Sequence, residues 1–345
     1  MRNSDNDADL VIITALQKEA SAVLDHLGDS TPVVRRGRTF YRSEIYSSKV
    51  NRKLSVIVLP QDQMGNVESA MATTQAIEVW NPQFLLLVGI AGGIESSDKT
   101  LGDIVVSEQV VNYEIGKVKN TGLENRWDVI KGSPLLLNIA KNMDDTSWVL
   151  DSKVARPDYS NIKPSVHFGV VGSGEKVIAN KAFSNLVINN WSKMAAVEME
   201  SYGVAYAAYK AESAPHFLMI KSICDWADST KNDAWQNYCA DIAASYATSI
   251  IDLMPFQSTQ RPQAQKKTVQ SFSHRSKIGL CGRMGDSWED LADWYDIPLS
   301  DRARFRLGRE CQDIWNWLLQ RGRLDNISDG LKGIGRDDLV DELIP

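Results

Sequence analysis

The chain has 345 residues, of which 43% are hydrophobic and 24% charged, and its formal net charge is −6. This composition is ordinary for a globular protein, and the length suffices for one large domain and one small one. The negative charge argues against a general nucleic-acid-binding protein, which needs a basic surface. No apolar run reaches the ~20 residues that a membrane span requires.

The N-terminal sequence MRNSDNDADL is polar and acidic, unlike a signal peptide. Four cysteines (Cys224, Cys239, Cys281 and Cys311) are widely spaced and do not follow metal-ligand spacing. We therefore expect a reduced, cytoplasmic protein without a disulfide framework, metal or cofactor.

Short apolar runs alternate with helical segments over the first 256 residues. Helical spacing occurs at 17–27, 64–80, 197–211 and 234–254, and strand-like runs lie at 9–16, 54–59, 84–93, 103–111, 167–174 and 216–225. The run at 84–93 ends in glycines, which predicts a strand followed by a tight turn. This alternation predicts an α/β domain with a mostly parallel sheet covered by helices on both faces.

The pattern changes after Phe256. Residues 257–276 are basic and polar with almost no aliphatic side chains, which predicts a linker. The rest of the chain, 277–345, has only helical patterning, with segments at 288–295, 303–322, 324–335 and 336–344. Four of the ten tryptophans fall in this tail, and a small helical bundle needs such bulky side chains for its core.

Two acidic residues follow or end predicted strands. Ligands of open parallel sheets bind at the carboxyl ends of the strands. Glu19 follows the first strand and could activate a water molecule; the alternative is a glutamate on a solvated helix face. Asp225 ends the run at 216–225 and could protonate a leaving group; the alternative is a helix N-cap.

Two further motifs lie between these acids in the sequence. The glycine-rich residues 89–93 would let a ligand approach the backbone, or simply form a turn. Glu198, Met199 and Glu200 suit a sugar, because carboxylates bind hydroxyls and a thioether packs on the ring; otherwise the acids favour a helix N-terminus. Together the four features provide what hydrolysis of a glycosidic bond needs.

Residues 9–254 resemble the nucleoside phosphorylase and nucleosidase superfamily, above all the methylthioadenosine/S-adenosylhomocysteine nucleosidases. The resemblance rests on LVGIAGGI, LGDIVVS, GSGEKVI, VEMESYGVAYAA and ICDWAD in the family's order. It implies a mixed, mostly parallel sheet flanked by helices, and cleavage of a purine N-glycosidic bond. Within that pattern, Glu19 matches the carboxylate that activates water and Asp225 the acid that protonates the purine.

The resemblance also implies substrate contacts. Met199 and Glu200 match ribose contacts, and Val177 and Ile178 fall where the family lines the base. Val177 stands where relatives usually have a stacking aromatic ring, and Trp235 aligns with a second aromatic that would compensate. Ala91, Gly92 and Glu198 complete the expected substrate contacts.

Hydrolysis is favoured over phosphorolysis. Phosphorylases of the superfamily carry an arginine just before the glycine segment, where this chain has Leu86, Leu87 and Val88. Glu19 would repel a phosphate nucleophile but suits water.

The 5′ end of the substrate is indicated by two basic positions. Lys117 aligns where an apolar residue is expected, and Arg35 lies in the RRGR segment after the first helix. Because lysine and arginine bind phosphate, we expect ATP or AMP; ordinary surface cations are the alternative.

Residues 277–345 resemble the death-fold superfamily through WEDLADWYDIP, DIWNWLLQRG and LKGIGRDDLVDEL. This implies a six-helix bundle that self-associates or binds another death fold; a generic helical interaction domain is the alternative. The pairing suggests an antiphage-type immune effector acting as a homo-oligomer. The rival hypotheses are a metabolic methylthioadenosine/S-adenosylhomocysteine nucleosidase and a non-catalytic purine-nucleotide sensor.

Overall fold

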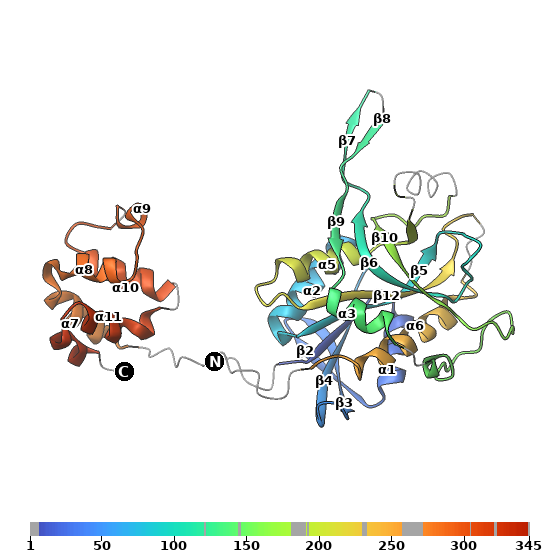
Figure 1. The fold of residues 1–345 in the computed structure, drawn as a ribbon, viewed down its shortest axis with the longest axis horizontal. Helices are drawn as coiled ribbons and strands as arrows, with labels where there is room; N and C mark the ends of the chain where they lie inside the picture. Colours follow the sequence, from blue (N-terminus) through green and yellow to red (C-terminus); the bar gives the residue numbers. More distant parts are fainter. Residues whose placement is uncertain are drawn as a thin grey trace. The chain divides into compact units, whose positions relative to one another are not determined.

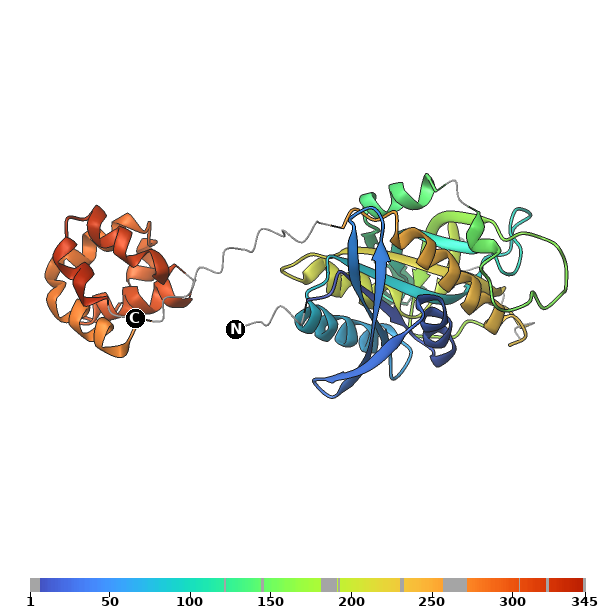
Figure 2. The same cartoon turned by 90° about the horizontal axis from the view of Figure 1, so that it is seen from below.

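The computed structural model describes residues 7–343 apart from 121, 144–145, 181–190, 192, 230–232, 257–271, 304 and 321–322. The chain divides into two compact units, Met1–Phe256 and Gln257–Pro345 (Figures 1 and 2). The linker predicted at 257–276 lies mostly outside the described residues.

The first unit is an α/β domain. Its described helices are α1 (Gln17–Leu27), α2 (Asn66–Trp80), α3 (Pro134–Lys141), η2 (Ser147–Val149), α5 (Ser201–Lys210) and α6 (Gln236–Ile251). Its strands are β1 (Leu10–Thr14), β2 (Ser30–Arg35), β3 (Arg38–Ser47), β4 (Arg52–Pro60), β5 (Phe84–Gly93), β6 (Ile104–Asn112), β7 (Gly116–Lys119), β8 (Gly122–Asn125), β9 (Asp128–Lys131), β10 (Val166–Ser173), β11 (Met194–Glu198) and β12 (His216–Asp225).

Ten strands form one mixed sheet in the order β11-β10-β6-β12-β5-β1-β4-β3-β2, with β9 paired to β6. Strands β4, β1, β5 and β12 run parallel, and β6, β10 and β11 run parallel to one another. The two sets meet in the antiparallel pair β12–β6. Strand β11 also pairs with the end of β5, through Ala196–Gly93 and Val197–Gly92, so five strands close into a ring.

Helices cover both faces of this sheet, as the sequence predicted. On one face α1 packs against α6 over an aliphatic core that includes Leu86 and Ile220. On the other face α2 packs against α5 over a core that includes Leu87 and Met219 (Figure 1). Adjacent strand residues alternate between these two cores because successive side chains point to opposite faces. Both faces are therefore apolar, which explains the near-continuous hydrophobic runs in the sequence.

Several elements were not expected from the sequence. Arg36 and Gly37 form the turn of the antiparallel hairpin β2–β3, and both have positive φ angles, 49° and 79°. A second hairpin, β7–β8, projects from the unit (Figure 1). The turn predicted at the glycines of 84–93 is wrong, because β5 continues to Gly93.

The second unit is helical among its described residues. It contains α7 (His274–Arg283), η3 (Gly285–Ser287), α8 (Trp288–Trp294), α9 (Leu299–Arg302), α10 (Glu310–Gln320), η4 (Leu324–Asn326), α11 (Ile327–Gly333) and η5 (Asp337–Glu342). Trp315 is buried in its core, with Trp288 and Trp317 packed around it. The long helix predicted at 303–322 is shorter than expected, since α10 begins at Glu310.

Within the part of the chain that the structure describes, we find no helix that is long and apolar enough to cross a membrane.

Candidate active site

A cavity of about 320 Å³ opens in the α/β unit where several strands end. Both proposed catalytic residues, Glu19 and Asp225, line it. Seven of the ten proposed substrate contacts line it too, namely Ala91, Gly92, Val177, Ile178, Glu198, Met199 and Glu200. Residues from seven separate stretches of the sequence thus meet at one place, as expected for ligands bound at strand ends.

Glu19 lies in the first turn of α1 and is 1% exposed. Its Oε2 accepts hydrogen bonds from the backbone amides of Ala15 (2.8 Å) and Leu16 (2.9 Å), and its Oε1 accepts one from Ile90 (2.8 Å). The alternative of a solvated helix-face glutamate is therefore excluded. Burial raises the pKa of Glu19, partly opposed by the positive charge of Lys221.

Glycines on β5 make room for both acids. A Cβ built at Gly89 would collide with Oε1 of Glu19, and one at Gly92 would lie 3.0 Å from Oδ1 of Asp225. The glycine segment is thus a strand whose missing side chains let two carboxyl groups lie against it.

Asp225 is the last residue of β12 and is 5% exposed. The register between β12 and β5 shifts between Ile223 and Asp225, so that Asp225 lies opposite Gly92. Such a bulge changes the direction in which a side chain points. The backbone amide of Ala227 donates to Oδ1 of Asp225 at 2.8 Å, and the Cys224 thiol lies 3.4 Å from Oδ2.

Glu198 and Glu200 share one buried lysine. Lys221 Nζ donates to Oε2 of Glu198 at 2.9 Å and to Oε2 of Glu200 at 2.7 Å, and the three side chains are almost completely buried. Burial alone would lower the pKa of Lys221, but Glu198, Glu200 and Glu19 raise it above its usual value. Burial likewise opposes ionisation of Glu198, but the charge of Lys221 and the hydrogen bonds from Lys221, Ser201 and the Glu200 amide together lower the pKa of that carboxyl.

The two glutamates otherwise differ. Glu198 accepts hydrogen bonds from the Ser201 amide and hydroxyl at the start of α5, so the helix N-terminal alternative applies to it. Oε1 of Glu200 accepts a hydrogen bond from the Gly65 amide at 3.3 Å. Glu200 is therefore the carboxylate better placed to bind a ligand, with the half-buried Met199 beside it.

Three proposed substrate contacts do not line this cavity. Trp235 lies at the start of α6, where the Arg156 guanidinium stacks over its ring at 4.8 Å. Arg35 ends β2, and its side chain donates to the carbonyl of Val34. Lys117 is exposed on the β7–β8 hairpin.

Other residues line the cavity that sequence reasoning did not single out, among them Lys18, Met64, Lys176 and Gln236. Lys221 was also missed, although a charged residue in the apolar run HFLMIKSICD is a usable signal. A buried lysine needs acidic partners, and these were already proposed site residues.

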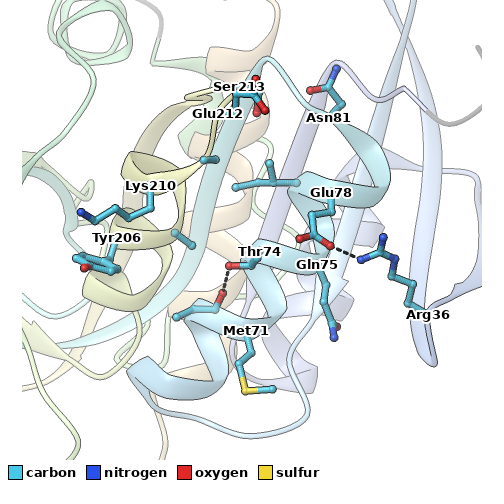
Figure 3. A pocket seen from close by; sticks show the side chains of 14 residues that line it. Arg36, Met71, Thr74, Gln75, Glu78, Asn81, Tyr206, Lys210, Glu212 and Ser213 are labelled. Atoms are coloured by element: carbon cyan, nitrogen blue, oxygen red, sulfur yellow. Dashed lines mark hydrogen bonds and ion pairs between the residues drawn. The ribbon is translucent and has the colours of Figure 1, made fainter. Parts of the chain in front are cut away.

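A larger hollow, about 1230 Å³, lies between α2 and α5 and has a different character (Figure 3). Arg36 and Glu78 form an ion pair at its edge, and Thr74 donates to the carbonyl of Ala70. None of the proposed site residues lines this hollow. Among the described residues of the whole chain, no three His, Cys, Asp or Glu side chains are grouped as a metal site requires.

Solved structures that resemble the α/β unit include nucleosidases. The 5′-methylthioadenosine/S-adenosylhomocysteine nucleosidase of Neisseria meningitidis, in complex with methylthio-immucillin-A, matches with a TM-score of 0.57. The match covers 71% of this chain and 99% of that structure at 17% sequence identity. The predicted nucleoside-phosphorylase-like fold is thereby confirmed.

Two named relatives match the α/β unit in sequence. The 5′-methylthioadenosine/S-adenosylhomocysteine nucleosidase of Oceanobacillus iheyensis is 24% identical over 70% of this chain and 97% of its own length. The ATP nucleosidase Cap17 of Escherichia coli is 27% identical over 70% of this chain and 50% of its own length. The chain spans about half the length of some curated relatives that it matches. These matches confirm the prediction of an enzyme of the nucleosidase type.

Family models cover both units. Residues 274–344 match Bacterial Death-like domain 3, which confirms the resemblance of the helical unit to death folds. Residues 9–254 match the Phosphorylase superfamily, and this range contains the whole cavity that Glu19 and Asp225 line. The chain therefore belongs to the phosphorylase superfamily and carries a bacterial death-like domain after its α/β unit.

Proposed function

We propose that the α/β unit hydrolyses the N-glycosidic bond of an adenine nucleotide, ATP or AMP, and releases adenine. The observation that carries this proposal is the placement of Glu19 and Asp225 in the wall of one cavity, each fixed by backbone amides. Glycosidic cleavage needs an acid for the leaving group and a base for water, and two such carboxyl groups are present.

Each carboxyl group has one role in this mechanism. Asp225 donates a proton to a ring nitrogen of the purine, so the base leaves as neutral adenine when the carbon–nitrogen bond breaks. Glu19 accepts a proton from the water that forms the new carbon–oxygen bond at the sugar. Glu200 accepts hydrogen bonds from the ribose hydroxyls, and Met199 packs on the apolar face of the sugar.

The electrostatics of the cavity suit these roles. A general base works best when its pKa approaches the working pH, and burial raises the pKa of Glu19 in that direction. Lys221 holds Glu200 at a fixed position and places a positive charge beside the carboxylates of Glu198 and Glu200.

Water is the nucleophile in this proposal. Leu86, Leu87 and Val88 are buried in the two aliphatic cores, so the segment before the glycines offers no cation for inorganic phosphate. An anionic nucleophile would also meet the carboxylates of Glu19 and Glu200.

The nucleotide substrate is supported by similarity to the ATP nucleosidase Cap17. The two cations proposed from the sequence to bind phosphate, Lys117 and Arg35, do not line the cavity of their own chain. They would bind phosphate only across a subunit boundary, in the homo-oligomer that we also propose.

A substrate panel tests the proposal. Adenine release is measured with ATP, AMP, adenosine and methylthioadenosine, using the full chain and its Glu19→Gln and Asp225→Asn variants. We expect ATP or AMP to have the highest kcat/KM, and both variants to lose adenine release from every substrate. Turnover of methylthioadenosine alone would contradict the nucleotide substrate and leave the N-glycosidase mechanism in place.

Methylthioadenosine salvage is the second candidate function. It is favoured by the apolar side chains of Leu16 and Met64 in the cavity wall, which suit a thioether better than a phosphate. The nucleosidase of Oceanobacillus iheyensis supports the same assignment.

We further propose that the enzyme is a cytoplasmic antiphage effector whose death-like domain clusters it or recruits a partner. The support is the pairing of a nucleosidase-type domain with a bacterial death-like domain. The test compares survival of phage infection by cells that express the full chain or its Asp225→Asn variant. Equal protection by both would instead favour a purine-nucleotide sensor that signals without catalysis.

A further inference from the structure

The catalytic cavity has an acidic floor. Glu19, Glu198, Glu200 and Asp225 are all buried there, with Lys221 as their cationic neighbour. Carboxylates repel phosphate, and the repulsion is stronger where water is excluded. A nucleotide can therefore place its base and ribose on the floor, while its phosphate groups must lie at the mouth.

Two lysines also line the cavity, Lys18 and Lys176, and unlike the four acids neither of them is buried. Lys176 forms an ion pair with Glu114, and its side chain is 58% exposed. Its charge is thus largely neutralised by protein and solvent before any ligand arrives.

Lys18 is in a different situation. Its half-buried side chain donates a hydrogen bond to Oε1 of Gln236, at the start of α6. Among the residues that the structure describes, no carboxylate forms an ion pair with it. An ammonium group has three donors, so the neutral amide leaves two donors and the full charge available.

The position of Lys18 is fixed relative to the reacting groups. It precedes Glu19 in the first turn of α1, and the hydrogen bonds from Ala15 and Leu16 to Glu19 hold that turn against the strand end. Gln236 holds the ammonium from the other side. Gln236 thus holds the half-buried ammonium group in the cavity wall, one residue before the proposed base.

From this placement we infer that Lys18 binds a phosphate group of the substrate and sets the preference for nucleotides over nucleosides. Gln236 is a positioning residue that orients the ammonium. This inference rests on the proposed function, since it names the group that recognises the nucleotide.

The test measures selectivity, not rate alone. Adenine release from ATP, AMP and adenosine is followed with the full chain and with Lys18→Met, Lys18→Arg and the matched control Lys176→Met. Lys18→Met removes the charge and keeps the length of the side chain. We expect it to lower kcat/KM for ATP and AMP relative to adenosine by roughly tenfold to a hundredfold, as expected for a lost charged hydrogen bond.

The other variants give the contrast. Lys18→Arg keeps the charge and should retain most of the preference, and Lys176→Met should change the ratio by less than about threefold because Glu114 already neutralises that lysine. The KM for ATP should rise with ionic strength more steeply in the unmodified chain than in Lys18→Met.

Two outcomes would overturn the inference, and they can be told apart. If the unmodified chain prefers nucleotides and Lys18→Met keeps that preference, another group binds the phosphate and the proposed function stands. If the unmodified chain shows no preference for nucleotides over adenosine, the role of Lys18 and the proposed nucleotide substrate fail together.

Discussion

The α/β unit and the helical unit bury different kinds of side chain. Among the described residues, the α/β unit buries Glu19, Glu198, Glu200, Asp225 and Lys221, whereas the helical unit buries no lysine, arginine, aspartate or glutamate. Burying charges costs free energy unless they are paired and hydrogen-bonded. The core of the α/β unit therefore carries the desolvation cost of several buried charges, whereas the described core of the helical unit is built without them.

The largest effect is expected when the two acids, Glu19 and Asp225, are neutralised. We expect Glu19→Gln and Asp225→Asn each to lower kcat for adenine release by roughly 10²–10⁴-fold, because each removes a proton-transfer group. Steady-state assays measure the loss, and light scattering should show that the oligomeric state of the full chain is unchanged. Full turnover by either variant would remove that residue from the mechanism.

The next largest effect is expected at Lys221. Lys221→Met leaves Glu198 and Glu200 buried without their cation, so the α/β unit should lose about 3–5 kcal/mol of unfolding free energy. Chemical denaturation of the full chain measures this loss. Lys221→Arg keeps the charge and should lose less.

Lys221 should also govern the acid limb of activity. Its positive charge lowers the pKa of Glu19 against the dominant effect of burial. Glu19 must be ionised to accept a proton, so activity is lost as the pH falls through its raised pKa. Removing the cation raises this pKa further, and the acid limb of kcat/KM in Lys221→Met should move to higher pH. A limb that stays in place would show that Glu19 is not the titrating base.

The packing of the helical unit can be tested with two neighbouring leucines of α10. Leu318 is completely buried, whereas Leu319 is 51% exposed. Leu318→Ala should destabilise the helical unit by about 2–5 kcal/mol, and Leu319→Ala by under about 1 kcal/mol. Thermal unfolding of the full chain distinguishes them. Equal losses would contradict the orientation of α10.

The smallest effect is expected at the hollow between α2 and α5. Glu78 pairs with Arg36 on an exposed surface and does not line the cavity of Glu19 and Asp225. Glu78→Gln should change the unfolding free energy by under about 1 kcal/mol and leave adenine release unchanged. A clear loss of turnover would mean that this larger hollow takes part in catalysis.

Much of this architecture could be predicted from the sequence, because the spacing of apolar residues indicates which side of a strand or helix is buried. The apolar runs at 9–16 and 216–225 contain β1 and β12, and the acids that follow the first run and end the second line one cavity. The hairpin β2–β3 was missed because β2 is largely exposed and its sequence does not alternate between apolar and polar residues. The hairpin β7–β8 was missed because its strands, GKVK and GLEN, each contain a single apolar residue. The prediction that the glycines of 84–93 form a turn was wrong. Gly89 and Gly92 lie within β5 and leave space for the carboxyl groups of Glu19 and Asp225, which are distant in the sequence.

Contacts between residues that are distant in the sequence were the hardest to predict. The link between Lys221 and Glu200 depends on β12 and β11 lying beside the same strand, β5, which no local pattern encodes. The position of the Lys18 ammonium group in the cavity wall likewise depends on its hydrogen bond to Gln236, which lies 218 residues further along the chain.

The ring of five strands has a consequence for how substrate range can change. Val197 and Asp225 are both paired with Gly92, so the segment that carries Glu198 to Glu200 and the strand that ends in Asp225 are joined through β5. Their spacing is therefore set by the sheet and not by side chains. Residues at the rim such as Lys18, Met64 and Val177 come from separate loops and helices and can be replaced one at a time. The superfamily could thus diversify in what it accepts while the bond it breaks stays the same.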